Sequence, residues 1–289
     1  MVCARLKTFN ALFSLHNKSK EKLIMKKTML ALALSLAAAT VFANGKKDSA
    51  ATLKVGATPE PHAEILNLVK EDLAENGITL EVIEFTDYVV PNEALESGEI
   101  DANFFQHLPY LESFNEERDY HLVNAGGIHI EPFALYSKKV SALDDVPEGA
   151  TVAIPNDPTN GGRALLLLQS AGIITLKAEA GITATPLDID TNPKNLKFSE
   201  VEAASLPRVL PDVDLAAING NYALPAGLSA SKDGLFVEGK DSPYVNVIAV
   251  KSGNESDPRI RALVKALQSQ KVKDYITNRY PNGEVVAVF

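Results

Sequence analysis

Short β-rich runs alternate with helical segments from Thr52 onward, and this alternation restricts the fold more than any other feature of the sequence. Residues 53–57 have the pattern of a strand, residues 63–75 that of an amphipathic helix, and residues 78–85 that of a second strand. Apolar side chains recur in the helix at spacings of three and four residues, and Gly77 ends it. A strand followed by a crossover helix and another strand predicts a parallel pairing.

The alternation continues through the rest of the chain. Residues 92–97 and 107–117 have helical patterns, with an extended run at 100–104 between them, so the first third predicts a βαβαβα series. A second series then follows, with strands expected at 133–137, 151–154, 213–218 and 245–250 and helices at 163–170 and 260–267. We therefore predict an α/β fold in which mixed, mostly parallel sheets are flanked by helices.

Two lobes account for the two series. Few linker-like residues separate them, so we expect the chain to cross between lobes twice, near 131–136 and near 242–246. Lobe 1 is predicted at 52–133 plus 246–289, and lobe 2 at 134–245. A cleft between two such lobes is a typical place for a ligand.

The first 43 residues have the pattern of a leader. Met25 is followed by two lysines and by an apolar run over 29–42, and Ala43 ends a small-x-small site for signal peptidase. The run is too short to span a bilayer, which takes about 20 apolar residues. We predict that residues 1–43 are a signal peptide with its start at Met25, and that the protein is exported to the periplasm or the cell envelope.

Charge and cysteine content exclude several classes of function. Without residues 1–43, which hold seven of the 28 basic and one of the 37 acidic residues, the formal net charge falls from −9 to −15. A surface this acidic argues against nucleic acid as a partner. The one cysteine, Cys3, lies in the leader, so a disulfide or a thiolate site is not expected. Asn44 stands after the predicted cut, where a lipoprotein would carry a cysteine, so lipid anchoring is not supported.

Aromatic and polar side chains gather at residues 87–111, near the ends of predicted strands, where open α/β sheets place ligand groups. Tyr88, Phe105 and His107 are candidates for a pocket wall, although aromatic residues in such a segment more often pack a core. His107 has no second histidine or carboxylate at metal-ligand spacing, so we interpret it as a hydrogen-bonding side chain.

Arg163 follows two glycines at the predicted start of a helix, which favours an anion site. The anion could be a carboxylate or a phosphate, and a solvated surface arginine is the alternative. Asn221 follows the strand at 213–218, and Asn246 lies inside an apolar strand. A buried amide needs a definite hydrogen-bond partner, either a ligand or the backbone.

Motifs of catalysis and of cofactor binding are missing from the sequence. It has no G-x-S-x-G, HExxH, CxxC or GxGxxG motif, and its carboxylates are scattered. We therefore predict a binding protein that is not an enzyme and that uses no cofactor and no metal.

Several motifs in one order resemble a known family. They are VGATP at 55–59, DYVVPNEAL and GEIDANFFQHLPYL within 87–111, IPNDPTNGGRALLLLQ at 154–169, INGNYALPAGL at 218–228 and SPYVNVIAV at 242–250. From Leu53 to Phe289 the chain resembles the NlpA-type substrate-binding proteins of methionine ABC importers. The resemblance implies a two-lobed periplasmic binding protein of type II-like fold, with the ligand in the cleft between the lobes.

The resemblance also implies a function and a set of binding residues. The protein would capture L-methionine or a close analogue and deliver it to the permease and ATPase of an importer. Tyr88, Phe105 and His107 would surround the thioether side chain, and Arg163 would bind the α-carboxylate. Asn221 and Asn246 would hold the amino and carboxylate groups, with Glu131 as a further candidate at the crossover. Another amino acid or a short peptide as ligand, or a role as a surface antigen or adhesin, remains the alternative.

Overall fold

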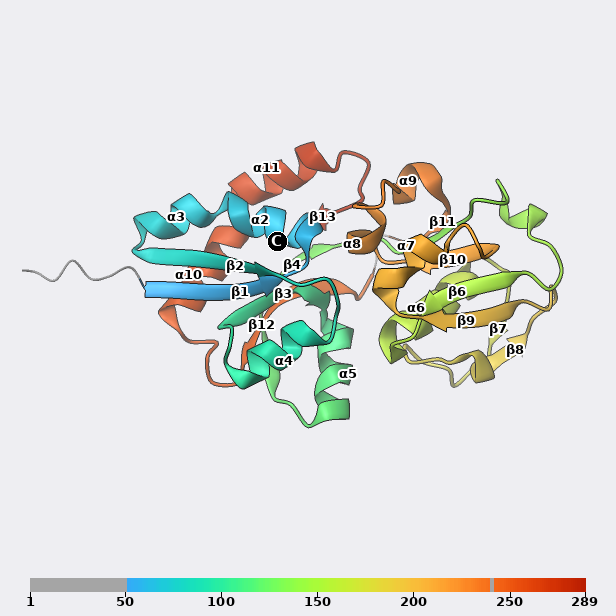
Figure 1. Cartoon of the computed structure of the whole chain (residues 1–289), viewed down its shortest axis with the longest axis horizontal. Helices are drawn as coiled ribbons and strands as arrows, with labels where there is room; N and C mark the ends of the chain where they lie inside the picture. Colours follow the sequence, from blue (N-terminus) through green and yellow to red (C-terminus); the bar gives the residue numbers. More distant parts are fainter. Residues whose placement is uncertain (1–50, 240–241) are drawn as a thin grey trace, which may run out of the picture. The chain divides into compact units, whose positions relative to one another are not determined.

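Two mixed β-sheets, each covered by helices, form most of the part of the chain that the computed structural model describes, residues 51–239 and 242–289 (Figure 1). The predicted leader, with its start at Met25, lies outside the described residues, as does Asn44. No helix within the described part is long and apolar enough to cross a membrane.

The first sheet has six strands. In spatial order they are β13 (Val286–Ala287), β4 (Leu122–Ile130), β12 (Val245–Lys251), β3 (Ala102–His107), β1 (Ala51–Ala57) and β2 (Ile78–Glu84). β1 pairs in parallel with both of its neighbours, so that Val55 lies opposite Val82 on one side and Ala102 on the other. The remaining pairings are antiparallel.

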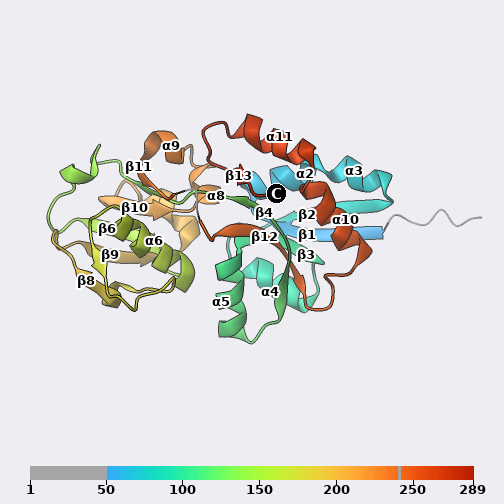
Figure 2. The ribbon, with the colours of Figure 1, turned by 180° about the vertical axis from the view of Figure 1, so that it is seen from behind.

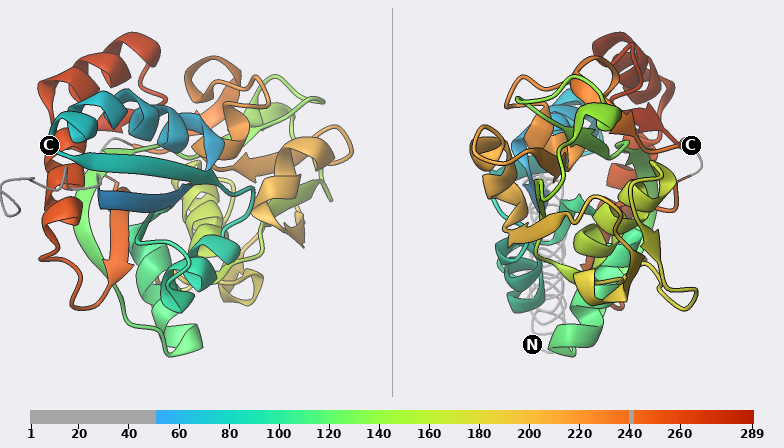
Figure 3. Two further views of the ribbon diagram at one scale, coloured as in Figure 1. Left: turned by 60° about the vertical axis from the view of Figure 1, so that its left-hand side comes forward. Right: turned by 90° about the vertical axis from the view of Figure 1, so that its right-hand side faces the viewer.

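Helices cover both faces of the first sheet, as Figures 2 and 3 show. One face is covered by α2 (Glu64–Leu68), α3 (Lys70–Glu75), α10 (Pro258–Leu267) and α11 (Gln270–Arg279), and the other by α4 (Val90–Ser97) and α5 (Leu108–Arg118). The helix predicted at 63–75 forms, with an interruption at Val69. Ile65 and Leu263 meet Val55 in one continuous core on the first of these faces.

The second sheet has five strands with the spatial order β11 (Gly234–Val237), β5 (Ala134–Tyr136), β10 (Leu215–Ile218), β6 (Thr151–Pro155) and β9 (Lys197–Val201). α6 (Pro158–Ser170) covers one face, and α7 (Leu206–Val209), α8 (Gly220–Ala223) and α9 (Ala230–Asp233) cover the other. Along β6, Val152 and Ile154 face the α6 side while Ala153 faces the opposite side. β6 and β10 are buried on both faces, which explains why these two strands are almost entirely apolar.

Shorter elements complete the chain. They are the turns η1 (Pro59–Ala63), η2 (Leu143–Asp145), η3 (Pro186–Asp188) and η4 (Ala203–Ser205) and the two-stranded ribbon of β7 (Thr175–Leu176) and β8 (Ile189–Thr191).

The chain passes from the first sheet to the second between Ile130 and Ala134 and returns between Val237 and Val245. Mixed sheets flanked by helices are confirmed, but antiparallel pairing takes a larger share than predicted, because both strands next to the return, β11 and β12, pair antiparallel to their neighbours. The lobe limits predicted at 133/134 and 245/246 stay a prediction.

Two predicted element limits are wrong. α6 begins at Pro158, five residues before the predicted start at 163, with Asp157 as its N-cap. β3 continues to His107, so Phe105 and His107 belong to a strand, and His107 caps the following helix.

Candidate functional site

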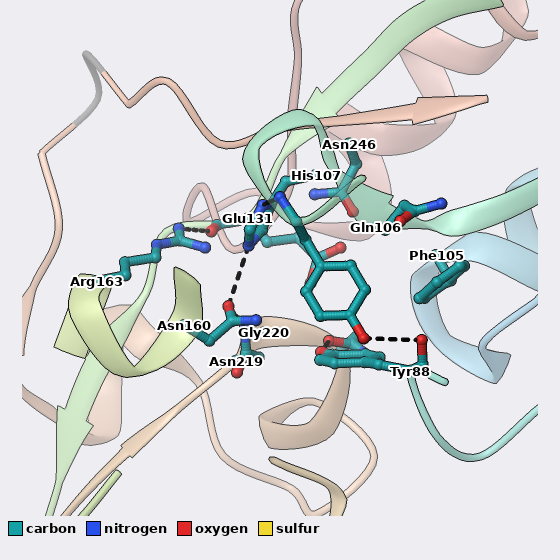
Figure 4. Close-up of a pocket in the computed structure, with 12 residues that line it drawn as sticks. Tyr88, Phe105, Gln106, His107, Glu131, Asn160, Arg163, Asn219, Gly220 and Asn246 are labelled. Carbon is teal, nitrogen blue, oxygen red and sulfur yellow. Dashed lines mark hydrogen bonds between the residues drawn. The ribbon is translucent and has the colours of Figure 1, made fainter. Parts of the chain in front are cut away.

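A pocket of about 320 Å³ lies between residues of the two sheets (Figure 4). Every residue predicted to bind a ligand lines this pocket. The full lining is Tyr88, Phe105, Gln106, His107, Tyr110, Glu131, Asn160, Arg163, Asn219, Gly220, Asn221 and Asn246.

Aromatic rings from the first lobe form one wall of the pocket. Tyr88 lies between β2 and α4, with its ring centroid 5.8 Å from that of Phe105 and 5.7 Å from that of Tyr110. The Tyr88 hydroxyl donates a hydrogen bond to Oδ1 of Asn221 at 2.5 Å, and burial raises its pKa well above the usual range, so it remains a donor. Phe104, by contrast, points away and is fully buried in the core.

His107 uses both of its ring nitrogens on protein partners. Nδ1 accepts a hydrogen bond from the backbone N–H of Tyr110 at 3.1 Å, so Nε2 carries the proton and donates to Oδ1 of Asn160 at 3.0 Å. Burial, with a contribution from the charge of Arg163, lowers the pKa of His107 to about 3. The side chain is therefore a neutral group that positions Asn160, as expected of a hydrogen-bonding histidine.

Arg163 lies in the second turn of α6, so its predicted place at the start of a helix is wrong, and the helix N-terminus adds no donors or dipole at this side chain. The two glycines before it lie inside the helix. They are glycine because neighbouring backbone comes close to the position of a side chain. A Cβ on Gly162 would lie 2.1 Å from the carbonyl oxygen of Ile182, and one on Gly161 would lie 3.0 Å from that of Pro155.

The guanidinium of Arg163 is held by the protein on one edge. Nε and Nη2 pair with the carboxylate of Glu238, and Nη2 also donates to the backbone oxygen of Glu131 at 2.9 Å. The rings of Tyr244 and Phe133 lie 4.1 Å and 4.9 Å from the guanidinium carbon. The hydrogen bonds of residues 51–239 and 242–289 leave Nη1 free for a ligand.

Glu131 brings a carboxylate to the opposite side of the pocket. It is 5% exposed, and His129 donates to its Oε1 from Nε2 at 2.8 Å. Burial raises the pKa of Glu131, while the nearby His62 and Arg163 and a hydrogen bond from the Asn221 backbone lower it. A carboxylate that accepts hydrogen bonds from N–H groups on one side can accept a cation on its other side.

Unused amide atoms complete the polar groups of the pocket. Oδ1 of Asn246 accepts a hydrogen bond from Nε2 of His62 at 3.0 Å, which leaves its Nδ2 as a donor. Nδ2 of Asn221 and Oδ1 of Asn219 are buried without a partner among the described residues. Buried polar atoms without partners at a pocket indicate that a ligand satisfies them.

One group of histidines and carboxylates in the described part of the chain has metal-ligand proximity, with atoms of His62, His129 and Glu131 within 4.8 Å of one another. Its short contact, 2.8 Å from Nε2 of His129 to Oε1 of Glu131, is the length of a charge-assisted hydrogen bond. Hydrogen bonding therefore explains the cluster.

Sequence reasoning missed three groups that matter to the pocket. Asn160 was visible only as a residue of a turn, yet its Oδ1 accepts from His107 and from Asn219 at 2.7 Å. Glu238 and His62 lie behind the pocket residues that they contact, and neither is in a motif of binding residues. The available signal for His62 was a histidine in a segment rich in turn residues, and the structure shows that this side chain is fully buried.

Comparison with known proteins gives the relationships of the chain. A model of the NlpA lipoprotein family matches residues 53–289. The chain is 49% identical over 234 residues to the membrane lipoprotein TpN32 of Treponema pallidum, covering 81% of this chain and 87% of that protein. It is 48% identical over 226 residues to the D-methionine-binding lipoprotein MetQ of Escherichia coli strain K12, covering 78% and 82%.

A solved structure supports the same relationship. A nutrient binding protein from Burkholderia cenocepacia, bound to methionine, matches with a TM-score of 0.79 and 50% identity, covering 82% of this chain and 100% of that one. Identity at this level over about four fifths of the chain confirms the resemblance inferred from the motifs. The chain belongs to the NlpA lipoprotein family.

Proposed function

We propose that the protein is the substrate-binding component of an ABC importer and that it binds methionine in the pocket between its two sheets. The observation that carries the proposal is a small pocket with free N–H donors from Arg163 and Asn246 and a buried acceptor on Glu131. Such an arrangement fits the carboxylate and the ammonium of a free amino acid. A relative named as a D-methionine-binding lipoprotein and a nutrient binding protein solved with methionine support this ligand.

Each binding residue receives a role in this proposal. Nη1 of Arg163 and the amides of Asn221 and Asn246 donate to the ligand carboxylate, and Glu131 accepts from its ammonium. Tyr88 and Phe105 contact the thioether, because sulfur packs favourably against aromatic rings. His107 acts through Asn160 and does not itself contact the ligand.

Capture takes place by closure of the two lobes, after which the protein hands the amino acid to a permease and its ATPase. An acidic, exported protein of the cell envelope suits this task, and the pocket recognises its ligand without a chemical step. The proposal limits the ligand to a single amino acid, because the donors of Arg163 and Asn246 and the acceptor of Glu131 suit a free carboxylate and a free ammonium of one molecule.

The test is a thermal unfolding series on purified protein freed of bound ligand, with L-methionine, D-methionine, methionine sulfoxide and methionyl dipeptides. At 100 times its dissociation constant, a ligand should stabilise the protein by about 2.7 kcal/mol. We expect stabilisation by methionine and none by the dipeptides. Stabilisation by a dipeptide or another amino acid, but not by methionine, would refute the ligand assignment.

A further inference from the structure

We propose that His62, which does not line the pocket, sets the donor and acceptor pattern of Glu131 and Asn246 and so selects ligands with a free amino group. Its Nε2 lies 3.0 Å from Oδ1 of Asn246 and 3.4 Å from Oε1 of Glu131. His62 is thus a positioning residue that acts on both sides of one binding site. The inference rests on the proposed function and adds to it the reason for amino-acid selectivity.

The imidazole of His62 is fixed in one orientation. It is fully buried in η1, and its ring packs edge-on against Phe104, with centroids 4.7 Å apart and planes at 85°. The ring of His129 lies 5.0 Å away on another side. Packing of this kind leaves the ring no alternative rotamer, so the positions of its two nitrogens are determined.

The partners of His62 determine which nitrogen carries the proton. Nε2 faces two oxygens, the amide Oδ1 of Asn246 and the carboxylate of Glu131, and both are acceptors. Nε2 must therefore be the N–H, and Nδ1 accepts from the hydroxyl of Thr58 at 2.8 Å. Burial lowers the pKa of His62 to about 4, so this neutral tautomer persists at neutral pH.

The proton on Nε2 fixes the amide of Asn246. An asparagine amide can present either its oxygen or its nitrogen to a ligand, and the two choices suit ligand groups of opposite polarity. Because Oδ1 accepts from His62, Nδ2 is the group presented to the pocket. Asn246 can then donate to a carboxylate but cannot accept from an ammonium.

The same histidine helps to hold Glu131 as the acceptor. His129 donates a hydrogen bond to Oε1 of this carboxylate, and Nε2 of His62, whose proton goes to Asn246, lies 3.4 Å from the same oxygen, so the two imidazoles fix its orientation. On its other side, Oε2 lies against Gly220, where a Cβ would come within 2.7 Å. Glu131 is thus the carboxylate acceptor for the ammonium of the ligand, beside the amide oxygen of Asn219 that is unpaired within the described part of the chain, and buried imidazoles set its position.

The experiment compares two ligands on four proteins. L-Methionine and 4-(methylthio)butanoate, which lacks the amino group, are titrated by calorimetry into the unsubstituted protein, His62→Leu and His62→Gln. A glutamine amide places an N–H close to the position of Nε2, whereas leucine offers no donor. The exposed His121, substituted as His121→Leu, serves as the matched control.

We expect His62→Leu to reduce the ratio of the two affinities, methionine over the analogue, by about tenfold or more, because the acceptor for the ammonium is no longer held. His62→Gln and His121→Leu should keep most of the ratio. An unchanged ratio in His62→Leu would refute the inference. Failure of the unsubstituted protein to bind methionine would instead refute the proposed function.

Two measurements on the unsubstituted protein test the inference without relying on a variant that folds. Nitrogen-15 NMR of the histidine rings should show the proton of His62 on Nε2, and a proton on Nδ1 would contradict the inference. Treatment with a chelator should leave methionine affinity unchanged. A loss of affinity would assign His62, His129 and Glu131 to a metal ion and overturn the hydrogen-bonding role.

Discussion

Arg163 illustrates how one side chain divides its donors between the fold and the pocket. Glu238 and the Glu131 carbonyl take Nε and Nη2, so a ligand carboxylate meets a single nitrogen of the guanidinium. The sequence and the family resemblance predicted this arginine as the residue that binds the ligand carboxylate. The structure leaves fewer guanidinium donors for the ligand. This explains why the amides of Asn221 and Asn246 are needed beside Arg163.

At the residue scale we predict that the two tasks of Arg163 can be separated. Arg163→Ala should lower methionine affinity and also reduce the free energy of unfolding by about 1–3 kcal/mol, since it leaves Glu238 without its partner. Adding Glu238→Gln should restore much of the stability but none of the affinity. Urea unfolding and calorimetry check the two effects. Tight methionine binding by the double variant would show that Nη1 is not a ligand contact.

The elements show what the sequence could and could not predict. Apolar runs such as those of β6 and β10 were identified because both of their faces are buried. β4 was missed, since Gly126 and Gly127 interrupt its pattern, and Gly126 is required because a Cβ there would lie 2.6 Å from Val264 of α10. A contact between positions so far apart in the chain leaves no local pattern.

The start of α6 was misplaced for a similar reason. Gly161 and Gly162 have the pattern of a helix boundary, whereas their role is close packing against the backbone of Pro155 and Ile182. The local signals for the true start were present, since Asp157 and Pro158 are a favourable N-cap and first-turn pair. The two glycines therefore serve tertiary packing and do not mark the start of the helix.

At the element scale we predict that Gly162→Ala destabilises the protein by about 1–3 kcal/mol, because the methyl group overlaps the backbone at Ile182. The shift of α6 should also weaken methionine binding through Arg163. Gly181→Ala is the matched control, because a Cβ at Gly181 meets nothing within 4 Å. Thermal unfolding of both variants checks this expectation, and equal melting temperatures would contradict it.

For the molecule as a whole, the sequence predicted residues that line the pocket better than the groups that support them. The seven predicted side chains line one pocket because they follow strand ends or occur in recognised motifs. The supporting role of His62 was not predicted, because its partner Asn246 is 184 positions away. A hydrogen bond between such distant residues depends on which strands lie side by side in the sheet. The order of the strands cannot be predicted from a single segment of the sequence.

Buried neutral histidines also predict the response of the whole molecule to acid. Burial lowers the pKa of His62 to about 4 and that of His107 to about 3, against an ordinary value of 6.5. Between these values the unfolded chain binds more protons than the folded one, so stability is lost as the pH falls below about 6.5. Each such histidine contributes a slope of about 1.4 kcal/mol per pH unit.

Urea unfolding at pH 7 and pH 5 measures this effect, and the free energy of unfolding should be lower at pH 5. His107→Gln should reduce the difference, whereas substitution of the exposed His121 by glutamine should leave it as it is. Equal stability of the unsubstituted protein at the two pH values would contradict the assignment of His62 and His107 as neutral.

Two hydrogen bonds reach across the pocket from one lobe to the other, from Tyr88 to Asn221 and from His107 to Asn160. Both must break before the lobes separate, and a ligand enclosed between them cannot leave earlier. The residence time of the bound amino acid is therefore governed by the frequency of opening. A transporter that pulls the lobes apart would then accelerate unloading, because opening also separates the ligand groups of one lobe from those of the other.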